Sequence, residues 1–309
     1  MTYCSAPGKV IIFGEHAVLY GEPAIAVAIN RRFHCDITES KGEKTTVNGL
    51  DFDPVKQPYL LNAINRLGID EPLNIQTRSE LISGAGMGSS AALTISSLGC
   101  LYSMKNKVDT ETIAKTGFEV EYETQGRASP IDTSTSAYGG GVMLSSTREE
   151  GLLWSISKGR NTWNVHESGI PKLQLVLGNT GVHSSTPNLV HKIREFINRS
   201  THARKIIKDI GITVRKGHEA LNRGDLEVVG RLMDQNQLLL SYLGVSHPKL
   251  DALIDAARKH SYGAKLTGVG GGGVMIAITD EPEETSKAIE EAGGQAHVLT
   301  STKKGLTFQ

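Results

Sequence analysis

The spacing of apolar positions changes along the chain from strand-like to helix-like. Short β-rich runs bounded by turn residues predict strands early in the chain, at 10–13, 24–29, 33–38 and 73–77. Spacings of three and four residues predict helices at 59–67, from about 89, and at 110–125, followed by an extended segment at 142–144. The first half is therefore expected to mix strands with helices.

Helical periodicity dominates the second half. A strand at 173–177 is expected to precede helices at 188–198, 202–222, 226–243, 248–260 and 282–292, with further strands at 274–278 and 296–299. No fixed-period repeat and no low-complexity linker interrupts the pattern. We expect an α+β protein of two closely packed lobes, residues 1–150 and 151–309, with the boundary falling around 145–170.

Composition excludes several classes of function. The 309 residues carry 33 Lys and Arg against 33 Asp and Glu, without a basic run, so we expect neither a nucleic-acid nor a membrane partner. Cys4, Cys35 and Cys100 are too few and too widely spaced to indicate a disulfide framework or a cysteine zinc site. Without a signal-peptide pattern or a membrane-spanning run, a cytoplasmic location is expected. A monomer and a homodimer both stay open.

A glycine-rich stretch at 83–92, SGAGMGSSAA, runs directly into a predicted helix. Glycines let backbone N–H groups approach an anion, and a helix N-terminus adds unpaired donors and the positive end of its dipole. The candidate phosphate-binding residues are Gly84, Ala85, Gly86, Met87, Gly88, Ser89 and Ser90. No Lys-Ser/Thr pair follows the glycines, so this is not a Walker A loop. The alternative is a glycine-rich turn capped by Ser89.

The second glycine run, GVGGGG at 268–273, formally matches the dinucleotide fingerprint. That fingerprint needs a strand before it and a helix after it, whereas here a helix and a short KLT precede and an apolar strand follows. An NAD-binding oxidoreductase is therefore disfavoured. We expect a loop that packs against the other glycine loop or against a ligand, with a purely structural turn as the alternative.

One carboxylate of the predicted helix 110–125 falls on its apolar face. A helical wheel places Glu121 with the inward-facing apolar residues, and Glu119 with Glu123 on the opposite face. A buried carboxylate is costly unless it is paired or coordinates a metal. Glu121 therefore predicts either a Mg²⁺ site shared with a serine or an ion pair with an arginine such as Arg127.

Four further polar residues could carry chemistry. Asp132 lies in a predicted loop rich in small polar residues, where it could be catalytic or could simply stabilise a turn. Lys9 directly precedes a strand, so it could pair with an acid or a phosphate, or be a solvated surface residue. Glu15 and His16 could contact a polar substrate or form a turn.

Three ordered motifs resemble those of the GHMP kinase superfamily. They are APGKVIIFGEHAVLYGEPAIAVAI at 6–29, GAGMGSSAA at 84–92 and KLTGVGGGG at 265–273. Within the superfamily, GEHAVLYG and the GNTGVHSST stretch at 178–186 are most similar to the mevalonate-phosphorylating branch. The resemblance implies a two-lobed α+β fold with an active site between the lobes. The N-terminal lobe would be related to ribosomal protein S5 domain 2, and the C-terminal lobe would be ferredoxin-like.

The resemblance also implies transfer of the γ-phosphoryl group of ATP to the C5 hydroxyl of mevalonate. Asp132 would be the catalytic base, and Lys9 would lie beside that acid and the transferred phosphate. Ser90 and Glu121 would hold Mg²⁺, and the glycine loop from Gly84 to Ser89 would wrap the ATP phosphates.

Substrate contacts follow from the same resemblance, which places Glu15 and His16 beside the mevalonate. Ile82, Pro130 and Pro187 depart from the superfamily pattern, but none of them replaces a charged catalytic group. The alternatives are a sibling kinase acting on phosphomevalonate or a related hydroxy acid, and an inactive nucleotide-binding sensor on the same fold.

Overall fold

The computed structural model describes residues 2–82, 86–126, 128–182 and 186–308, and within these ranges it contains two sheets. The larger sheet has nine strands, in the order β4-β3-β5-β2-β6-β8-β7, with β1 paired to β2 and to β13. Their bounds are β1 (Thr2–Phe13), β2 (Ala24–Glu39), β3 (Thr46–Val47), β4 (Leu50–Asp51), β5 (Leu73–Ser79), β6 (Gly141–Ser145), β7 (Leu152–Lys158), β8 (Asn161–Ser168) and β13 (Thr307–Phe308).

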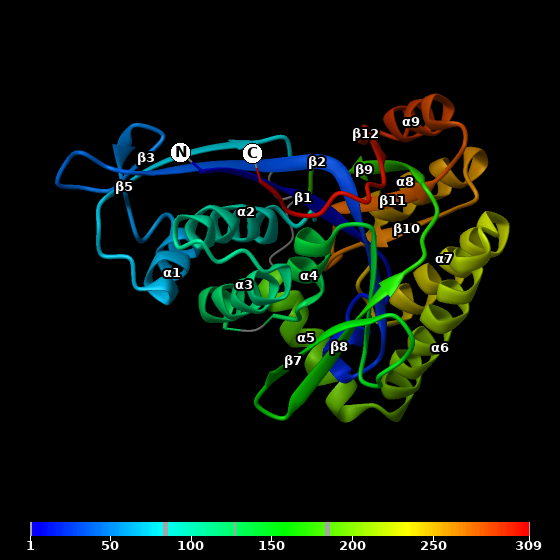
Figure 1. Cartoon of the computed structure of the whole chain (residues 1–309). Coiled ribbons are helices and arrows are strands. Elements are labelled where there is room, and N and C mark those ends of the chain that lie inside the picture. Colours follow the sequence, from blue (N-terminus) through cyan, green and yellow to red (C-terminus); the bar gives the residue numbers. More distant parts are fainter. Residues whose placement is uncertain (1, 83–85, 127, 183–185, 309) are drawn as a thin grey trace.

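Four helices lie together on one side of the larger sheet (Figure 1). They are α1 (Pro58–Leu67), α2 (Ser89–Met104), α3 (Thr110–Gln125) and α4 (Ile131–Tyr138). The bounds of α3 follow from its caps: the Asp109 carboxylate accepts a hydrogen bond from the Thr112 amide, and Gly126 ends the helix at a φ of 71°. The apolar face predicted from the periodicity of α3 is buried, where α3 packs against α1, α2 and α4.

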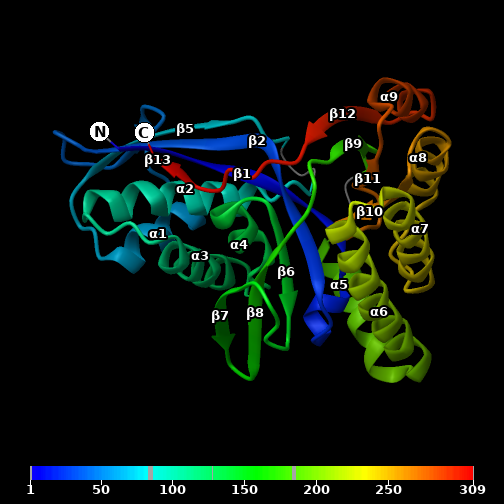
Figure 2. The ribbon, with the colours of Figure 1, turned by 45° about the vertical axis from the view of Figure 1, so that its right-hand side comes forward.

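The smaller sheet is antiparallel, in the order β10-β11-β9-β12, and helices pack against it (Figure 2). The elements are β9 (Gln174–Asn179), β10 (Gly263–Thr267), β11 (Val274–Ile278), β12 (Gln295–Thr300), α5 (Thr186–Arg199), α6 (Thr201–Arg223), α7 (Leu226–Tyr242), α8 (Pro248–Ala257) and α9 (Pro282–Glu291), with short 3-10 helices η1 (Ala17–Tyr20) and η2 (Arg258–His260). Over the ranges given above, no helix combines the length and the apolar character needed to cross a bilayer.

Strands β1 and β2 contribute to both hydrophobic cores of the molecule. Successive side chains of a strand point to opposite faces. Val10 and Ile12 accordingly join the core of the smaller sheet, while Ile11 joins the core under the helices α2 and α3. The register of β1 against β2 shifts between Pro7 and Lys9, an irregularity of the kind that re-aims side chains. The side chains of β1 and β2, two strands of the larger sheet, thus connect the two cores, and Lys9 lies at the irregular point of β1.

The structure corrects several element predictions. Residues 24–39 form one long strand, β2, where two shorter strands were expected, and Arg32 lies within it. The hairpin of β7 and β8 was not predicted. Asp132 was expected in a loop but lies in the first turn of α4, a helix rich in Ser and Thr that have low intrinsic helix propensity. The larger sheet continues to Ser168, and the division of the chain at 150 and 151 stays a prediction.

Candidate active site

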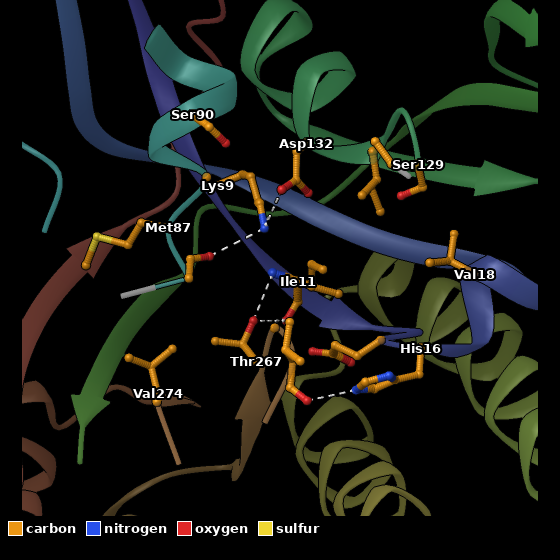
Figure 3. Close-up of a pocket in the computed structure, with 18 of the residues that line it drawn as sticks. Lys9, Ile11, His16, Val18, Met87, Ser90, Ser129, Asp132, Thr267 and Val274 are labelled. Atoms are coloured by element: carbon orange, nitrogen blue, oxygen red, sulfur yellow. Dashed lines mark hydrogen bonds and ion pairs between the residues drawn. The ribbon is translucent and has the colours of Figure 1, made fainter. Parts of the chain in front are cut away.

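A cavity of about 500 Å³ lies where β1, the N-termini of α2 and α4, and the glycine-rich turn between β10 and β11 meet (Figure 3). Every candidate site residue that the structure describes lines it: Lys9, Glu15, His16, Gly86, Met87, Gly88, Ser89, Ser90, Glu121 and Asp132. Gly84 and Ala85 lie outside the described residues. The fold therefore gathers candidates from distant parts of the sequence around one space.

Lys9 and Asp132, which both line the cavity, form an ion pair. Lys9 Nζ lies 3.1 Å from Asp132 Oδ2, and the two side chains point toward each other (Figure 3). The lysine side chain is only 5% exposed, so the surface-lysine alternative is wrong. Lys9 Nζ also donates to the Gly86 carbonyl at 3.4 Å. One ammonium group thus links the candidate base to the candidate phosphate loop.

The glycine loop fits around Lys9 only because Gly88 has no side chain. A Cβ at Gly88 would lie 2.9 Å from Lys9 Cε, and its φ of 69° is one that L residues rarely adopt. Gly88 is also the N-cap residue of α2, so Ser89 does not cap this helix. The first-turn amides of α2 therefore border the cavity without a capping side chain at the N-cap position, an arrangement that suits an anion.

Glu121 points inward, as its position on the helical wheel predicted. It is 2% exposed and accepts a hydrogen bond from Ser90 Oγ at 2.8 Å. Burial raises the pKa of Glu121 to about 8; the nearby charge of Asp132 adds to this shift, and the Ser90 bond and the Lys9 charge oppose it. Burial thus disfavours the ionised form of Glu121, a cost that a bound cation would offset. Arg127, the alternative ion-pair partner, lies outside the described residues.

The donors around Glu121 fit a hard divalent cation. A carboxylate and a hydroxyl are oxygen ligands of the kind that Mg²⁺ prefers, and Mg²⁺ usually completes its shell with substrate phosphates and water. Within the described ranges, no cluster of three or more His, Cys, Asp or Glu side chains could hold a metal ion by itself. Ser90 and Glu121 supply two oxygen ligands, which suits a cation that also takes ligands from a bound phosphate and water.

Glu15 and His16 line the far side of the cavity. The His16 ring lies 2.9 Å from the Val269 carbonyl, and since a carbonyl only accepts, Nε2 carries the proton. Burial lowers the pKa of His16, which leaves the ring neutral at pH 7. Glu15 is buried and pairs with Lys265 of β10.

Sequence reasoning missed two residues that shape the site, Lys265 and Thr267. Both belong to the KLT segment of the third motif, and their spacing of two places them on the same face of β10. The Thr267 hydroxyl accepts from the Ile11 amide at 3.2 Å and donates to the Ile11 carbonyl at 3.1 Å. The Thr267 hydroxyl thus links β10 to β1 by two hydrogen bonds beside the cavity.

The strand residues on either side of the second glycine run, Thr267 and Val274, approach Gly86 of the first glycine loop, whereas Gly270 and Gly272 of the run itself lie against Val245 and Val182. A Cβ at Gly86 would lie 3.1 Å from Val274 Cγ2 and 3.7 Å from the Thr267 carbonyl. Packing of the run against the first loop or a ligand stays a prediction. The run lies between β10 and β11, so a strand precedes it, contrary to the expectation, and no helix follows. The dinucleotide-binding arrangement, which needs that helix, is not formed here.

Comparison with known proteins gives independent evidence about the family of this chain. Residues 56–140 match the family model described as GHMP kinases N terminal domain, and residues 218–297 match GHMP kinases C terminal. The chain is 34% identical over 284 residues to a mevalonate kinase of Methanothermobacter thermautotrophicus, an alignment that covers 88% of each chain. It is 32% identical to a mevalonate kinase of Thermococcus sibiricus over 99% of this chain and 97% of that protein.

A solved structure agrees with the sequence relatives. The crystal structure of the Methanococcus jannaschii mevalonate kinase superposes with a TM-score of 0.78 at 29% identity, covering 97% of this chain and 98% of that one. The similarity therefore extends over both sheets and the cavity between them.

Proposed function

This chain belongs to the GHMP kinase family, and we propose that it transfers the γ-phosphoryl group of ATP to the C5 hydroxyl of (R)-mevalonate. The products are (R)-5-phosphomevalonate and ADP. The relatives named mevalonate kinase support this assignment over nearly the whole chain. The observation that carries it is the buried Lys9–Asp132 pair, which faces the uncapped N-terminus of α2 in a single cavity.

Asp132 is the proposed base that accepts the proton of the attacking hydroxyl. Transition states of phosphoryl transfer are loose, so most of the acceleration comes from positioning and charge neutralisation. A positioned base adds roughly 10²–10⁴-fold. Lys9 contacts both the acid and the Gly86 carbonyl, so its positive charge lies between the base and the loop that receives the phosphates. Lys9 is accordingly expected to matter as much as the base.

Ser90 and Glu121 are the residues that we propose hold Mg²⁺. When bound, Mg²⁺ neutralises charge on the β- and γ-phosphates. The protein contributes the rest: the side chains of Ser90 and Glu121 form one oxygen-rich edge of the cavity, and the backbone amides of the first turn of α2 would donate to the phosphate oxygens. Glu15 and His16 are the proposed contacts for mevalonate.

Some expectations about the whole protein stay predictions. These are the cytoplasmic location, the lobe boundary at 150 and 151, the choice between monomer and homodimer, and the lack of nucleic-acid and membrane partners. None of them alters the chemistry proposed for the cavity.

A substrate panel tests the proposed function. The purified protein is incubated with MgATP and one acceptor at a time: (R)-mevalonate, 5-phosphomevalonate, homoserine, galactose or none, and ADP formation is followed with a coupled assay. We expect kcat/KM for (R)-mevalonate to exceed that for the other acceptors by at least about 10²-fold. Faster turnover of 5-phosphomevalonate would reassign the chain to a sibling activity. A lack of ADP formation with every acceptor would favour a nucleotide-binding sensor.

A further inference from the structure

A buried ion pair lies beside the cavity, between Glu15 and Lys265. The side chain of Lys265 is 0% exposed and that of Glu15 is 1% exposed. Lys265 Nζ donates to Glu15 Oε1 and to the Leu266 carbonyl. Glu15 lines the cavity, whereas Lys265 stands behind it and is not among the lining residues. Lys265 therefore does not touch a ligand in the cavity, and among the described residues its one hydrogen bond to a lining side chain is the one to Glu15.

Stability alone gives a poor reason for this pair. Taking two charges out of water is expensive, and replacing a buried ion pair with apolar residues of similar volume is often neutral or stabilising. The cross-strand neighbour of Lys265 on β11 is the fully buried Ile276, so an apolar side chain at Lys265 would have an apolar partner. We therefore look for a role of the Glu15–Lys265 ion pair in ligand binding.

The two oxygens of Glu15 are not equivalent. Oε1 accepts from Lys265, whereas Oε2 is buried and has no hydrogen-bond partner among the described residues. An ionised carboxylate is an acceptor only, and a buried acceptor without a donor is costly. The second oxygen of Glu15 thus needs a donor that a ligand in the cavity can supply.

We propose that Lys265 is a positioning residue that holds Glu15 so that its second oxygen accepts a hydrogen bond from a hydroxyl group of the bound alcohol substrate. This role rests on the proposed function and deepens it, because it names the part of the site that selects the acceptor. A fixed carboxylate favours hydroxyl donors and repels carboxylate or phosphate groups at the same place. It would therefore discriminate against an acceptor oriented with its anionic end toward Glu15.

The charged groups that face Glu15 make the pH dependence of mevalonate binding a second measurement of this role. They are Lys265 from β10 and Lys9 from β1, and the neighbouring His16 is neutral. Burial raises the pKa of Glu15, and the charge and hydrogen bond of Lys265 are the main influences that lower it. Without Lys265 the pKa of Glu15 should rise further, so that mevalonate binding would be lost at a higher pH than in the wild type.

Lys265→Met tests this role, and Lys287→Met is its matched control, because Lys287 is an exposed lysine in an ion pair within one helix. We expect the KM for mevalonate to rise about 10- to 100-fold, the loss typical of a hydrogen bond to a charged group. The KM for ATP should change by no more than about twofold, and the acid limb of kcat/KM for mevalonate should move to higher pH by about one unit. The control should match the wild type in all three.

A folded Lys265→Met protein with wild-type KM for mevalonate and an unmoved acid limb would overturn the role. If that variant does not fold, the Glu15→Gln/Lys265→Met double variant, which buries no charge at either position, replaces it. The double variant should bind ATP and keep the raised KM; a wild-type KM would again overturn the role. A wild-type protein without mevalonate-dependent ADP formation refutes the proposed function itself, whereas an active wild type beside an unaffected Lys265→Met protein refutes only the role of Lys265.

Discussion

At Glu121, burial and a neighbouring acid raise the pKa to about 8, so the metal-free folded protein holds a proton there at pH 7. The unfolded chain releases that proton near pH 4.5, the ordinary value for this group. The folded state therefore binds more protons between these values, and the contribution of Glu121 to stability is lost as the pH rises from about 4.5 to about 8.

Glu121→Gln should remove this pH dependence. In metal-free protein, we expect the free energy of unfolding of the variant to rise relative to that of the wild type between pH 5 and pH 8.5, by at most about 5 kcal/mol for a shift of this size. Urea unfolding at the two pH values measures the difference. A gap between the two proteins that stays the same at both pH values would contradict the raised pKa.

Gly88 carries a second prediction at this scale. Gly88→Ala forces a Cβ to within 2.9 Å of Lys9 Cε, whereas Gly68→Ala, the matched control, introduces a Cβ at a similar positive φ with open space around it. Both variants should lose about 1 kcal/mol of stability from the backbone strain. Only Gly88→Ala should lower kcat, by about tenfold or more, because it displaces Lys9. Equal effects of both variants on kcat would show that the position of Lys9 is not critical.

What the sequence can predict about single residues depends on how local the signal is. The inward direction of Glu121 follows from the apolar pattern of its own helix, and the candidate phosphate loop can be recognised by its high glycine content. The pairing of Lys9 with Asp132 and of Glu15 with Lys265 joins residues far apart in the chain, and no local pattern specifies it. For Lys9 and Asp132 the family resemblance supplied the pairing; for Lys265 nothing did.

Among the elements, α4 shows how packing overrides propensity. Its sequence IDTSTSAY reads as a loop because Ser and Thr favour turns. In the structure, Thr133, Ser134, Thr135 and Ser136 are buried, and hydroxyls bond back to the helix, as in Thr135 Oγ1 to the Ile131 carbonyl at 2.6 Å. Small side chains let this helix lie close to β1, β2 and β6, which places Asp132 opposite Lys9. Such a close approach becomes visible only in three dimensions.

The contact between β10 and β1 rests on the Thr267 hydroxyl. Thr267→Val keeps the shape of the side chain but leaves the Ile11 amide and carbonyl without that partner. We expect a loss of about 1–3 kcal/mol in the free energy of unfolding and a fall in kcat/KM, because this contact borders the cavity. Thr213→Val is the control: Thr213 is also buried, but its hydroxyl bonds only to the Asp209 carbonyl of its own helix. A loss of activity in both variants, or in neither, would argue against the special role of this contact.

At the scale of the whole molecule, β1 and β2 of the larger sheet place side chains in both cores, which explains the close packing of the two sheets. The alternating side chains of β1 and β2 pack into both cores, and residues from both halves of the chain line the cavity. The chain ends also meet, since Cys4 of β1 pairs with Phe308 of β13 (Figure 2). Periodicity predicted most of the helices, and the lack of a low-complexity linker in the sequence suggested that the two lobes pack closely. Periodicity could not predict pairing between strands at opposite ends of the sequence, because that depends on the assembled sheet.

The central claim is that Asp132, held by Lys9 beside the phosphate loop, activates the hydroxyl of mevalonate. The most direct test measures kcat with (R)-mevalonate and MgATP, together with the Kd for ATP, in the wild type and in Asp132→Asn. The account predicts that kcat falls by roughly 10²–10⁴-fold while the Kd for ATP changes by no more than about threefold. A variant that turns mevalonate over at the wild-type rate would contradict it.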